Sequence, residues 1–339
     1  MQNNSLAVNN SGGRIEYIDT FRTIGIILMI MGHVGFGSVF DKWIHAFNMP
    51  MFFFISGWFF RDKSNNSFYY YVIKKIKKLL VPYFIFGSIV FIISVLFIKG
   101  FDVSLSLKQF LWNNTGGYQP IPGALWFLTS IFFVEIIYYI LNSTFTNKLI
   151  LTIVISIISI TTSFFAPVFY NNLPWALSSS LIGIGFFHLA VLINKSELKN
   201  KRVFNPIIIF VAGVIISVSV MFNKYVNIRT GLFQYTPLFW INAIVSIIIG
   251  WNISIYFDKF IHNKLNSFFS RIIHDIGKNS IVYLCLNQLI IVLIRQLMGY
   301  YDYFILYKSV IVFFITIIIL IVLEKIICTT KLNGILGNW

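Results

Sequence analysis

Charge is scarce in this sequence, and acidic charge is scarcer still. Only 11% of the 339 residues are charged, with 11 Asp and Glu against 26 Lys and Arg, whereas 58% are hydrophobic. Those fractions lie far outside the range of soluble domains and indicate a polytopic membrane protein. The net charge of +15 would suggest nucleic acid in a soluble chain. Here the retention of Lys and Arg in cytoplasmic loops is the simpler cause, so we expect no nucleic-acid partner.

Cysteine is also rare, and residues 1–13 do not resemble a leader peptide. The two cysteines, Cys285 and Cys328, lie in apolar segments without metal-ligand spacing, so we expect inert thiols and no metal. Residues 1–13 are polar and uncharged, without the basic and apolar regions of a cleavable signal peptide. We expect them to form a disordered cytoplasmic tail, and the first apolar segment to remain as an uncleaved anchor.

Long apolar runs are what the sequence does contain, and they predict an all-α integral membrane protein with about ten transmembrane helices. The expected spans are 20–38, 44–60, 81–98, 124–142, 149–166, 174–193, 205–222, 237–256, 279–298 and 304–327. Most of the 26 basic residues then fall on one side, which places both termini in the cytoplasm. Residues 14–330 form one membrane domain, and 331–339 are expected to be a second cytoplasmic tail.

The first apolar run carries two ionisable residues, Arg22 and His33. Eleven residues are close to three helical turns, so the two lie on one helix face about 16 Å apart. Ionisable groups inside a bilayer are costly, which favours a functional role. A neutral imidazole at His33 can accept a proton from a hydroxyl nucleophile, or it can simply pack against a neighbouring helix beside its glycines. Arg22 is either an anion clamp or an ordinary positive-inside anchor.

Three further charged residues are candidates. Lys75 and Lys78 are three residues apart before Pro82, so a helix points both the same way and forms a cationic shelf for phosphates. The alternative is an ordinary basic loop. Glu135 lies near mid-membrane, where it either orients His33 or pairs with a cation such as Arg295.

Weaker candidates are polar or aromatic residues that either line a site or link helices. They are His45, Asn48, Trp126, His188, Asn242, Asn287 and Gln288. Residues 99–123 form the longest predicted outer loop, and its glycines and prolines make it a candidate for covering a site.

Several segments together resemble a known family. The run from Tyr17 to His33 resembles the first helix of membrane-bound acyltransferase family 3, the bacterial polysaccharide O-acetyltransferases. FNMPMFFFISGWFF (47–60) looks like its second helix, and KKIKKLLVPY (74–83) looks like its basic segment before proline. ALWFL (124–128) and GKNSIVYLCLNQ (277–288) resemble later landmarks. The match covers most of the chain.

The resemblance implies a ten-helix core in the bacterial plasma membrane that transfers an acyl group, usually acetyl, from acetyl-CoA to a sugar hydroxyl. The acceptor is a surface glycan or its lipid-linked oligosaccharide precursor. His33 matches the essential histidine, Arg22 the arginine paired with it, and Lys75 and Lys78 the basic pair that holds the coenzyme. Glu135 is the candidate second catalytic residue.

Three departures from the family pattern stand out. Lysine replaces arginine at both basic positions, which keeps the charge but loses the bidentate fork. Asn48 and Asn287 stand where the family often has histidine, and His45 lies about one turn from the first of them. We therefore predict that His45, Asn48, Trp126 and Asn287 bind the acceptor.

Two other function classes remain open from the residues alone. Buried Arg, His and Glu also mark substrate and proton pathways in transporters and flippases of lipid-linked glycans. Such transporters often show paired broken helices in two related halves, and no such repeat is visible in the sequence. A membrane sensor or scaffold is the third class, with the charged groups only fastening helices together.

Overall fold

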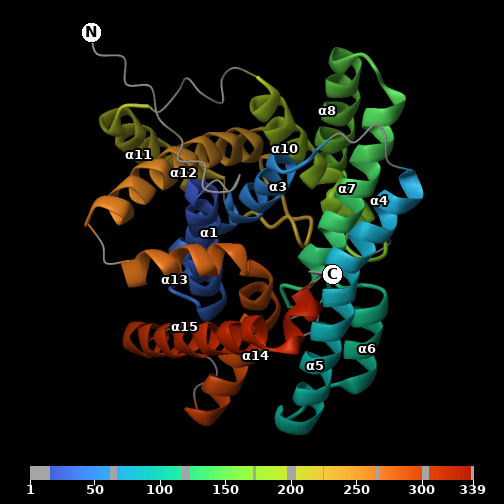
Figure 1. Ribbon diagram of the computed structural model, residues 1–339. Coiled ribbons are helices and arrows are strands. Elements are labelled where there is room, and N and C mark those ends of the chain that lie inside the picture. The colour runs from blue at the N-terminus through green and yellow to red at the C-terminus, as the bar shows by residue number, and fades with distance from the viewer. Residues whose placement is uncertain are drawn as a thin grey trace.

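The chain is almost entirely helical where the computed structural model describes it, at residues 16–61, 67–116, 123–170, 173–196, 204–223, 225–264, 267–299 and 305–336. Within those ranges the only β-pairing is one isolated bridge between Asn227 and Leu232. The helices (Figure 1) are α1 (Glu16–Val34), α2 (Ser38–His45), α3 (Asn48–Trp58), α4 (Phe68–Lys75), α5 (Val81–Phe97), α6 (Val103–Leu111), α7 (Trp126–Thr144), α8 (Lys148–Phe164), α9 (Ala166–Phe169), α10 (Leu177–Lys195), α11 (Pro206–Phe222), α12 (Thr236–Lys264), α13 (Ser267–Lys278), α14 (Ser280–Leu297) and α15 (Leu306–Thr329). The all-α prediction is confirmed.

Seven helices in the described ranges are long and apolar enough to cross a membrane. They are Glu16–Val34, Phe68–Phe97, Trp126–Thr144, Leu177–Lys195, Thr236–His262, Ser280–Leu297 and Leu306–Thr329. The apolar helices α8 and α11 are shorter. The protein is therefore a multi-pass membrane protein, and every expected span except 44–60 coincides with one apolar helix.

The expected span at 44–60 is wrong as a single helix. The chain leaves helical geometry at Phe47, with φ −141°, and restarts as α3, which has 11 residues. Pro50 lies in the first turn of α3, where its missing N–H costs no hydrogen bond. At 1.5 Å per residue α3 is about 16 Å long, roughly half of the hydrocarbon thickness. Nearly all of α3 is buried, so it is a core helix.

α1 lies at the centre of the bundle (Figure 1), in contact with α3, α12, α13, α14 and α15. Its apolar residues Ile18, Phe21, Ile26 and Ile30 are at most 1% exposed. Gly35, at φ +75°, ends the helix, and its N–H donates to the carbonyl of Met31. The helix that carries Arg22 and His33 is therefore held on several sides.

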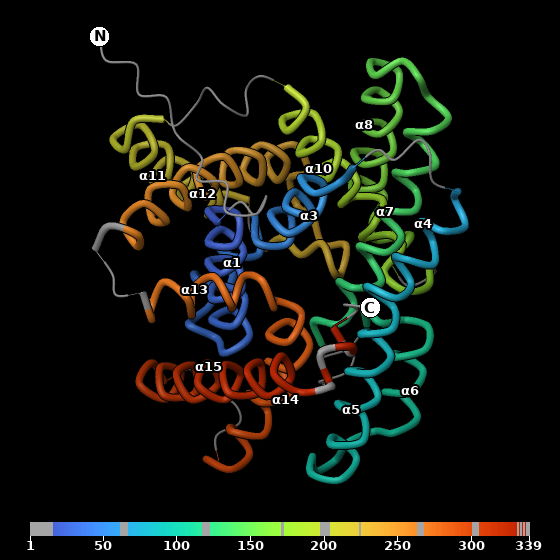
Figure 2. Tube along the Cα trace, viewed as in Figure 1, coloured from blue at the N-terminus to red at the C-terminus, as the bar shows by residue number. Residues whose placement is uncertain are grey.

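α4 and α5 form one continuous helix through a π-helical turn at Ile76–Leu80, which the trace in Figure 2 shows without a break. Pro82 explains the turn, because proline has no N–H and its ring clashes with the carbonyl four residues earlier. The wider π turn accommodates both defects, and such turns are frequent at functional sites. The segment 68–80 thus runs directly into the membrane helix.

The ends of the chain differ in how far they are described. Residues 331–336 form a 3-10 helix, η3 (Lys331–Leu336), that packs against α15 and α5, and Leu336 is buried. The expected tail at 331–339 is therefore partly packed on the core. The expected tail at 1–13 lies outside the described residues, as do residues 117–122 of the predicted outer loop. The rest of that loop contains α6.

The tightest contact between α3 and α10 is at Gly57. A Cβ added there would lie 2.1 Å from the carbonyl oxygen of Phe187, which is backbone and cannot rotate away. We expect Gly57→Ala to lower the free energy of unfolding by about 1–3 kcal/mol, the usual cost of overpacking. Thermal unfolding in detergent measures it.

Gly213, in α11, provides the matched control, because no atom lies within 4 Å of the Cβ position there. Gly213→Ala is expected to be neutral or to stabilise α11 by about 0.5–1 kcal/mol, since alanine favours helix. Equal stability of the two variants would contradict the close approach of α3 and α10.

Candidate functional site

His33 is held by one well-defined hydrogen bond. Its Nδ1 lies 2.6 Å from Oδ1 of Asn287 on α14. The amide nitrogen of Asn287 donates to the carbonyls of Tyr283 and Leu284 at 2.7 and 2.8 Å, so the amide oxygen must face the imidazole. An amide oxygen only accepts, so Nδ1 carries the proton. The lone pair of the neutral ring is then on Nε2, which has no hydrogen-bond partner among the described residues.

His33 lines a cavity of about 310 Å³ between the end of α1, α2, α3, the start of α7 and residues 225–229. His45, Asn48 and Trp126 line the same cavity. The structure therefore brings three of the four predicted acceptor-binding residues beside His33. The fourth, Asn287, contacts His33 directly and is fully buried.

Asn48 offers an unsatisfied acceptor. It is 5% exposed, and its Oδ1 has no hydrogen-bond partner among the described residues. A buried amide oxygen left without a donor costs about 1–3 kcal/mol. Because Asn48 lines the cavity, a hydroxyl of a bound molecule can donate to it.

His45 is oriented by its own helix. Its Nδ1 lies 2.8 Å from the carbonyl oxygen of Asp41 and 3.2 Å from that residue's carboxylate. The ring of Tyr225 lies over it at a centroid distance of 5.2 Å. Asp41 and Tyr225 also line the cavity. The side of the cavity formed by Asp41, His45 and Tyr225 therefore combines a carboxylate, an imidazole and a phenol.

Arg229 is a cavity residue that the sequence analysis did not single out. It lies in the turn after α11, where Asn227 pairs with Leu232 and Gly231 has φ +67°. Its guanidinium donates to the carbonyl of Gly116 at 3.4 Å, and it is close enough to His33 to interact electrostatically. The sequence indicated Arg229 only as an arginine in a predicted outer loop, where the positive-inside rule makes basic residues uncommon.

A second polar group surrounds Arg22, near the other end of α1. Arg22 pairs with Asp19 at 3.5 Å and lies 4.8 Å from the ring centroid of Phe59. Lys78 is close enough to interact electrostatically with Arg22, Lys75 and Glu135. The structure thus places Arg22, Lys75 and Lys78, here named the cationic cluster, in one region.

Glu135 contacts the cationic cluster through Lys75 and makes no described contact with His33. Its carboxylate forms an ion pair with Lys75 and accepts a hydrogen bond from Tyr71 at 2.7 Å. Asn287 occupies the orienting position instead, which removes the basis for a His33–Glu135 pair. Glu135 does pair with a cation, but that cation is not Arg295. The guanidinium of Arg295 donates to the carbonyl of Val34, at the end of α1.

Lys75 and Lys78 do not present equivalent charges, although both were expected on one shelf. Lys75 is turned inward, with 15% of its side chain exposed, and its charge is engaged by Glu135. Lys78 lies within the π turn, is exposed, and forms no ion pair with the described residues. The π turn changes the register of the two side chains relative to an α-helix.

The helices and this cavity define a multi-pass membrane protein with an imidazole held in one orientation at a small cavity. Arg22 of the cationic cluster lies about 16 Å from that imidazole along α1. Residues 15–325 match the family described as an acyltransferase domain. The chain belongs to acyltransferase family 3 and is a membrane acyltransferase. No curated protein and no solved structure matches it.

Proposed function

We propose that this acyltransferase moves an acetyl group from acetyl-CoA to a hydroxyl of a bacterial surface glycan or its lipid-linked precursor. The observation that carries the proposal is the fixed tautomer of His33, whose Nε2 is an acceptor beside the cavity. A neutral imidazole nitrogen within reach of a hydroxyl is a suitable general base.

In the proposed reaction the acceptor hydroxyl gives its proton to Nε2 of His33 as its oxygen attacks the thioester carbonyl. The C–S bond breaks, and the proton moves from His33 to the leaving thiolate. The products are the ester and the free thiol, and His33 returns to its neutral form. Oδ1 of Asn287 accepts the hydrogen bond from Nδ1–H of His33 through both proton transfers, and this hydrogen bond favours the imidazolium.

Binding of the donor is proposed at the cationic cluster. Phosphates bind most strongly through charge-assisted hydrogen bonds to Arg and Lys. With the N-terminus in the cytoplasm, as the distribution of basic residues favours, this cluster faces the compartment that contains acetyl-CoA. The pantetheine arm then runs along α1 for about 16 Å to His33.

The acceptor is proposed to lie in the cavity, with one hydroxyl donating to Oδ1 of Asn48. Trp126 provides an apolar ring surface of the kind on which sugar rings pack. A second hollow of about 1300 Å³ is lined by apolar residues of α1, α2, α3, α11 and α12, among them Trp43 and Phe47. Trp43 and Phe47 are neighbours of the cavity residues Ile44 and Asn48, which supports a lipid-linked acceptor.

The test is label transfer by purified protein in lipid nanodiscs. We expect radiolabel from the acetyl group of acetyl-CoA to appear, alkali-labile, in glycans or lipid-linked oligosaccharides extracted from bacterial envelopes. Label found on the protein, and removed by hydroxylamine, would replace direct transfer with an acetyl-histidine intermediate.

A transporter of glycan lipids is the competing function, and the same preparation distinguishes it. Movement of a fluorescent lipid-linked sugar across proteoliposomes, with no transfer of label to any acceptor, would overturn the proposal. Transfer of label without such movement supports it.

A further inference from the structure

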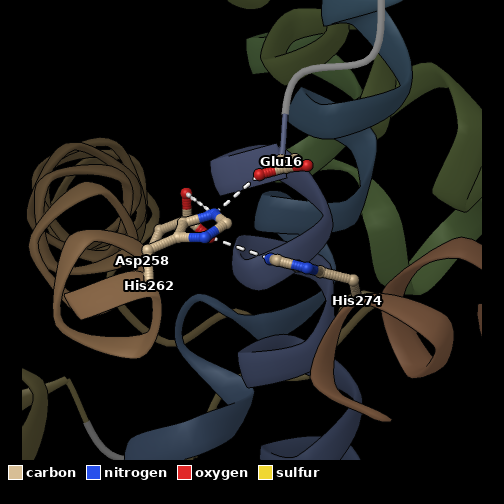
Figure 3. A group of neighbouring side chains, drawn as sticks. All are labelled: Glu16, Asp258, His262 and His274. Atoms are coloured by element: carbon tan, nitrogen blue, oxygen red, sulfur yellow. Dashed lines mark hydrogen bonds and ion pairs between the residues drawn. The ribbon is translucent and has the colours of Figure 1, made fainter. Parts of the chain in front are cut away.

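A third polar cluster lies at the N-terminal end of α1, outside the site described above. Its members, here named the four-ligand cluster, are Glu16, Asp258, His262 and His274. Glu16 is the first residue of α1, Asp258 and His262 are one turn apart on α12, and His274 comes from α13 (Figure 3). One potential ligand atom from each residue lies within 4.8 Å of the other three.

The distances are close to those of a coordination shell. Nε2 of His262 lies 2.6 Å from Oε2 of Glu16 and 3.9 Å from Oδ2 of Asp258, and Nε2 of His274 lies 2.9 Å from Oδ1 of Asp258. Tetrahedral zinc with bonds near 2.0–2.2 Å places its ligand atoms about 3.3–3.6 Å apart. An ion at the centre therefore requires only small side-chain movements.

The donor set favours one kind of ion. Two imidazole nitrogens together with two carboxylate oxygens form a ligand set that suits Zn²⁺, whereas Ca²⁺ and Mg²⁺ prefer oxygen alone. Two carboxylates also balance the charge of a divalent cation. Acidic residues and histidines are rare in this chain, which has 11 and five of them. Four of these 16 residues nevertheless meet at one place, which favours a ligand set over a chance contact.

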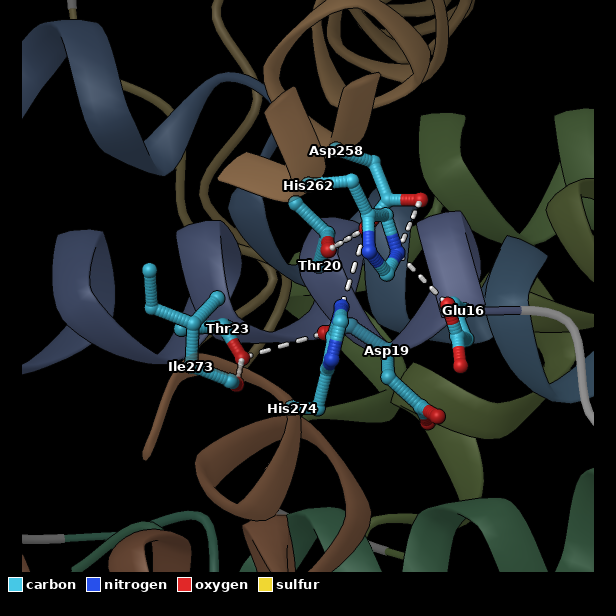
Figure 4. Close-up of polar contacts among 8 residues, drawn as sticks. All are labelled: Glu16, Asp19, Thr20, Thr23, Asp258, His262, Ile273 and His274. Atoms are coloured by element: carbon cyan, nitrogen blue, oxygen red, sulfur yellow. Dashed lines mark hydrogen bonds and ion pairs between the residues drawn. The ribbon is translucent and has the colours of Figure 1, made fainter. Parts of the chain in front are cut away.

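Hydrogen bonds from two threonines of α1 hold the residues of the cluster and their helices in place, as Figure 4 shows. The hydroxyl of Thr20 donates to Oδ1 of Asp258 at 2.7 Å. The hydroxyl of Thr23 donates to the carbonyl of Ile273 at 2.5 Å, which fastens α1 to α13 beside His274. Such outer contacts orient metal ligands. His262 is 49% exposed in its side chain, which leaves an entry path for an ion.

We propose that Glu16, Asp258, His262 and His274 bind one Zn²⁺ ion that joins the start of α1 to α12 and α13. The site is structural, since all four tetrahedral positions are filled by protein. It lies about 9 Å along α1 from Arg22, so it fixes the end of the helix that carries both parts of the proposed active site. The expectation of no metal rested on the cysteines, whereas these ligands come from segments more than 240 residues apart.

A proton competes with the ion for this site. The hydrogen bond to Asp258, with that carboxylate's charge and those of Glu16 and Asp19, raises the pKa of His274. Zn²⁺ binds only the unprotonated Nε2 of His274, so zinc binding is best measured in mildly alkaline buffer.

The test is metal content and Co²⁺ spectroscopy on purified full-length protein in detergent. After dialysis against Zn²⁺ and removal of excess ion, we expect about one Zn²⁺ per chain, and a Co²⁺-loaded sample with the strong visible bands of tetrahedral coordination. His262→Gln is the first variant, because its exposed side chain makes misfolding improbable. It should lower Zn²⁺ affinity about 10-fold or more and weaken the visible bands.

A matched control exists at Asp41 and His45, which have the same four-residue spacing of Asp and His on a helix and pair with each other. The double variant Asp41→Asn with His45→Gln should keep the full zinc content. Loss of zinc in this control, or equal zinc content in wild type and His262→Gln, would overturn the site. Octahedral Co²⁺ spectra in the wild type, meaning an adventitious ion only, would do so too.

Discussion

Replacing His33 with alanine is expected to abolish acyl transfer while leaving the protein folded. General base catalysis contributes about 10²–10⁴-fold in rate, so the loss of Nε2 should reduce kcat by at least that factor. His33 is only partly buried at the end of α1, beside a cavity, so its removal leaves most helix packing in place. Initial rates of label transfer, with acetyl-CoA binding and thermal unfolding measured in parallel, give the result.

Variants of Asn287 distinguish a role in positioning His33 from a role in helix packing alone. Asn287→Leu removes the acceptor for Nδ1–H, and we expect kcat to fall about 10–100-fold, the range seen when residues behind a functional histidine are replaced. The KM for acetyl-CoA should not change, because Asn287, on α14, contacts His33, which is about 16 Å along α1 from Arg22 of the cationic cluster. Asn287→Asp retains an oxygen at this position and should recover much of the activity.

Two outcomes would contradict this assignment. A His33→Ala protein with wild-type transfer would exclude His33 as the base. An Asn287→Leu variant that loses stability and acetyl-CoA binding to the same degree as activity would make Asn287 a packing residue only.

The sequence predicted the helical architecture well because apolar runs near 20 residues have few other solutions in a bilayer. It failed at 44–60 since apolar composition does not distinguish a spanning helix from a core helix. Phe47 and Pro50 break and restart the helix there, and the tertiary environment then buries nearly all of α3.

Several residues that the structure places at the cavity were singled out from the sequence, but Arg229 was not, and neither were the pairings. Polar residues within apolar runs identified His33, His45, Asn48, Trp126 and Asn287, which meet at one cavity or contact one another. Pairing depends on helix packing, and the sequence left Glu135 open between orienting His33 and pairing with a cation such as Arg295. The interaction of Glu135 with Lys75 depends on the orientation of α4 against α7, and no local pattern encodes it.

The four-ligand cluster was beyond sequence reasoning for the same reason. Asp258 and His262 have a helical i, i+4 spacing, but the same spacing occurs at Asp41 and His45 without further ligands. Only the crossing of α1, α12 and α13 brings Glu16 and His274 to the first pair.

The second large effect is expected in the cationic cluster, where Lys75 and Lys78 should behave differently. Removing one partner of a buried ion pair commonly costs about 3–5 kcal/mol. Lys75→Met leaves Glu135 buried without its cation, so we expect a large loss of stability. Lys78→Ala removes an exposed charge, so stability should be unchanged, while the KM for acetyl-CoA rises about 10–100-fold through the loss of a charge-assisted contact to phosphate.

A neighbouring lysine provides the control for this contrast. Lys77→Ala removes a neighbouring exposed lysine and should alter neither stability nor the KM for acetyl-CoA. An equal effect of Lys77→Ala and Lys78→Ala would mean that the cluster attracts the donor only through its overall charge.

The double variant Lys75→Met with Glu135→Leu decides the role of Glu135. Replacing both members of a buried pair by apolar residues is often neutral, so stability should recover relative to Lys75→Met alone. If Glu135 serves only to hold Lys75 and Tyr71, kcat should recover together with stability. A stable double variant with kcat reduced as far as in His33→Ala would restore Glu135 to the catalytic machinery, and would show that its carboxylate acts on the reaction without contacting His33 in the resting structure.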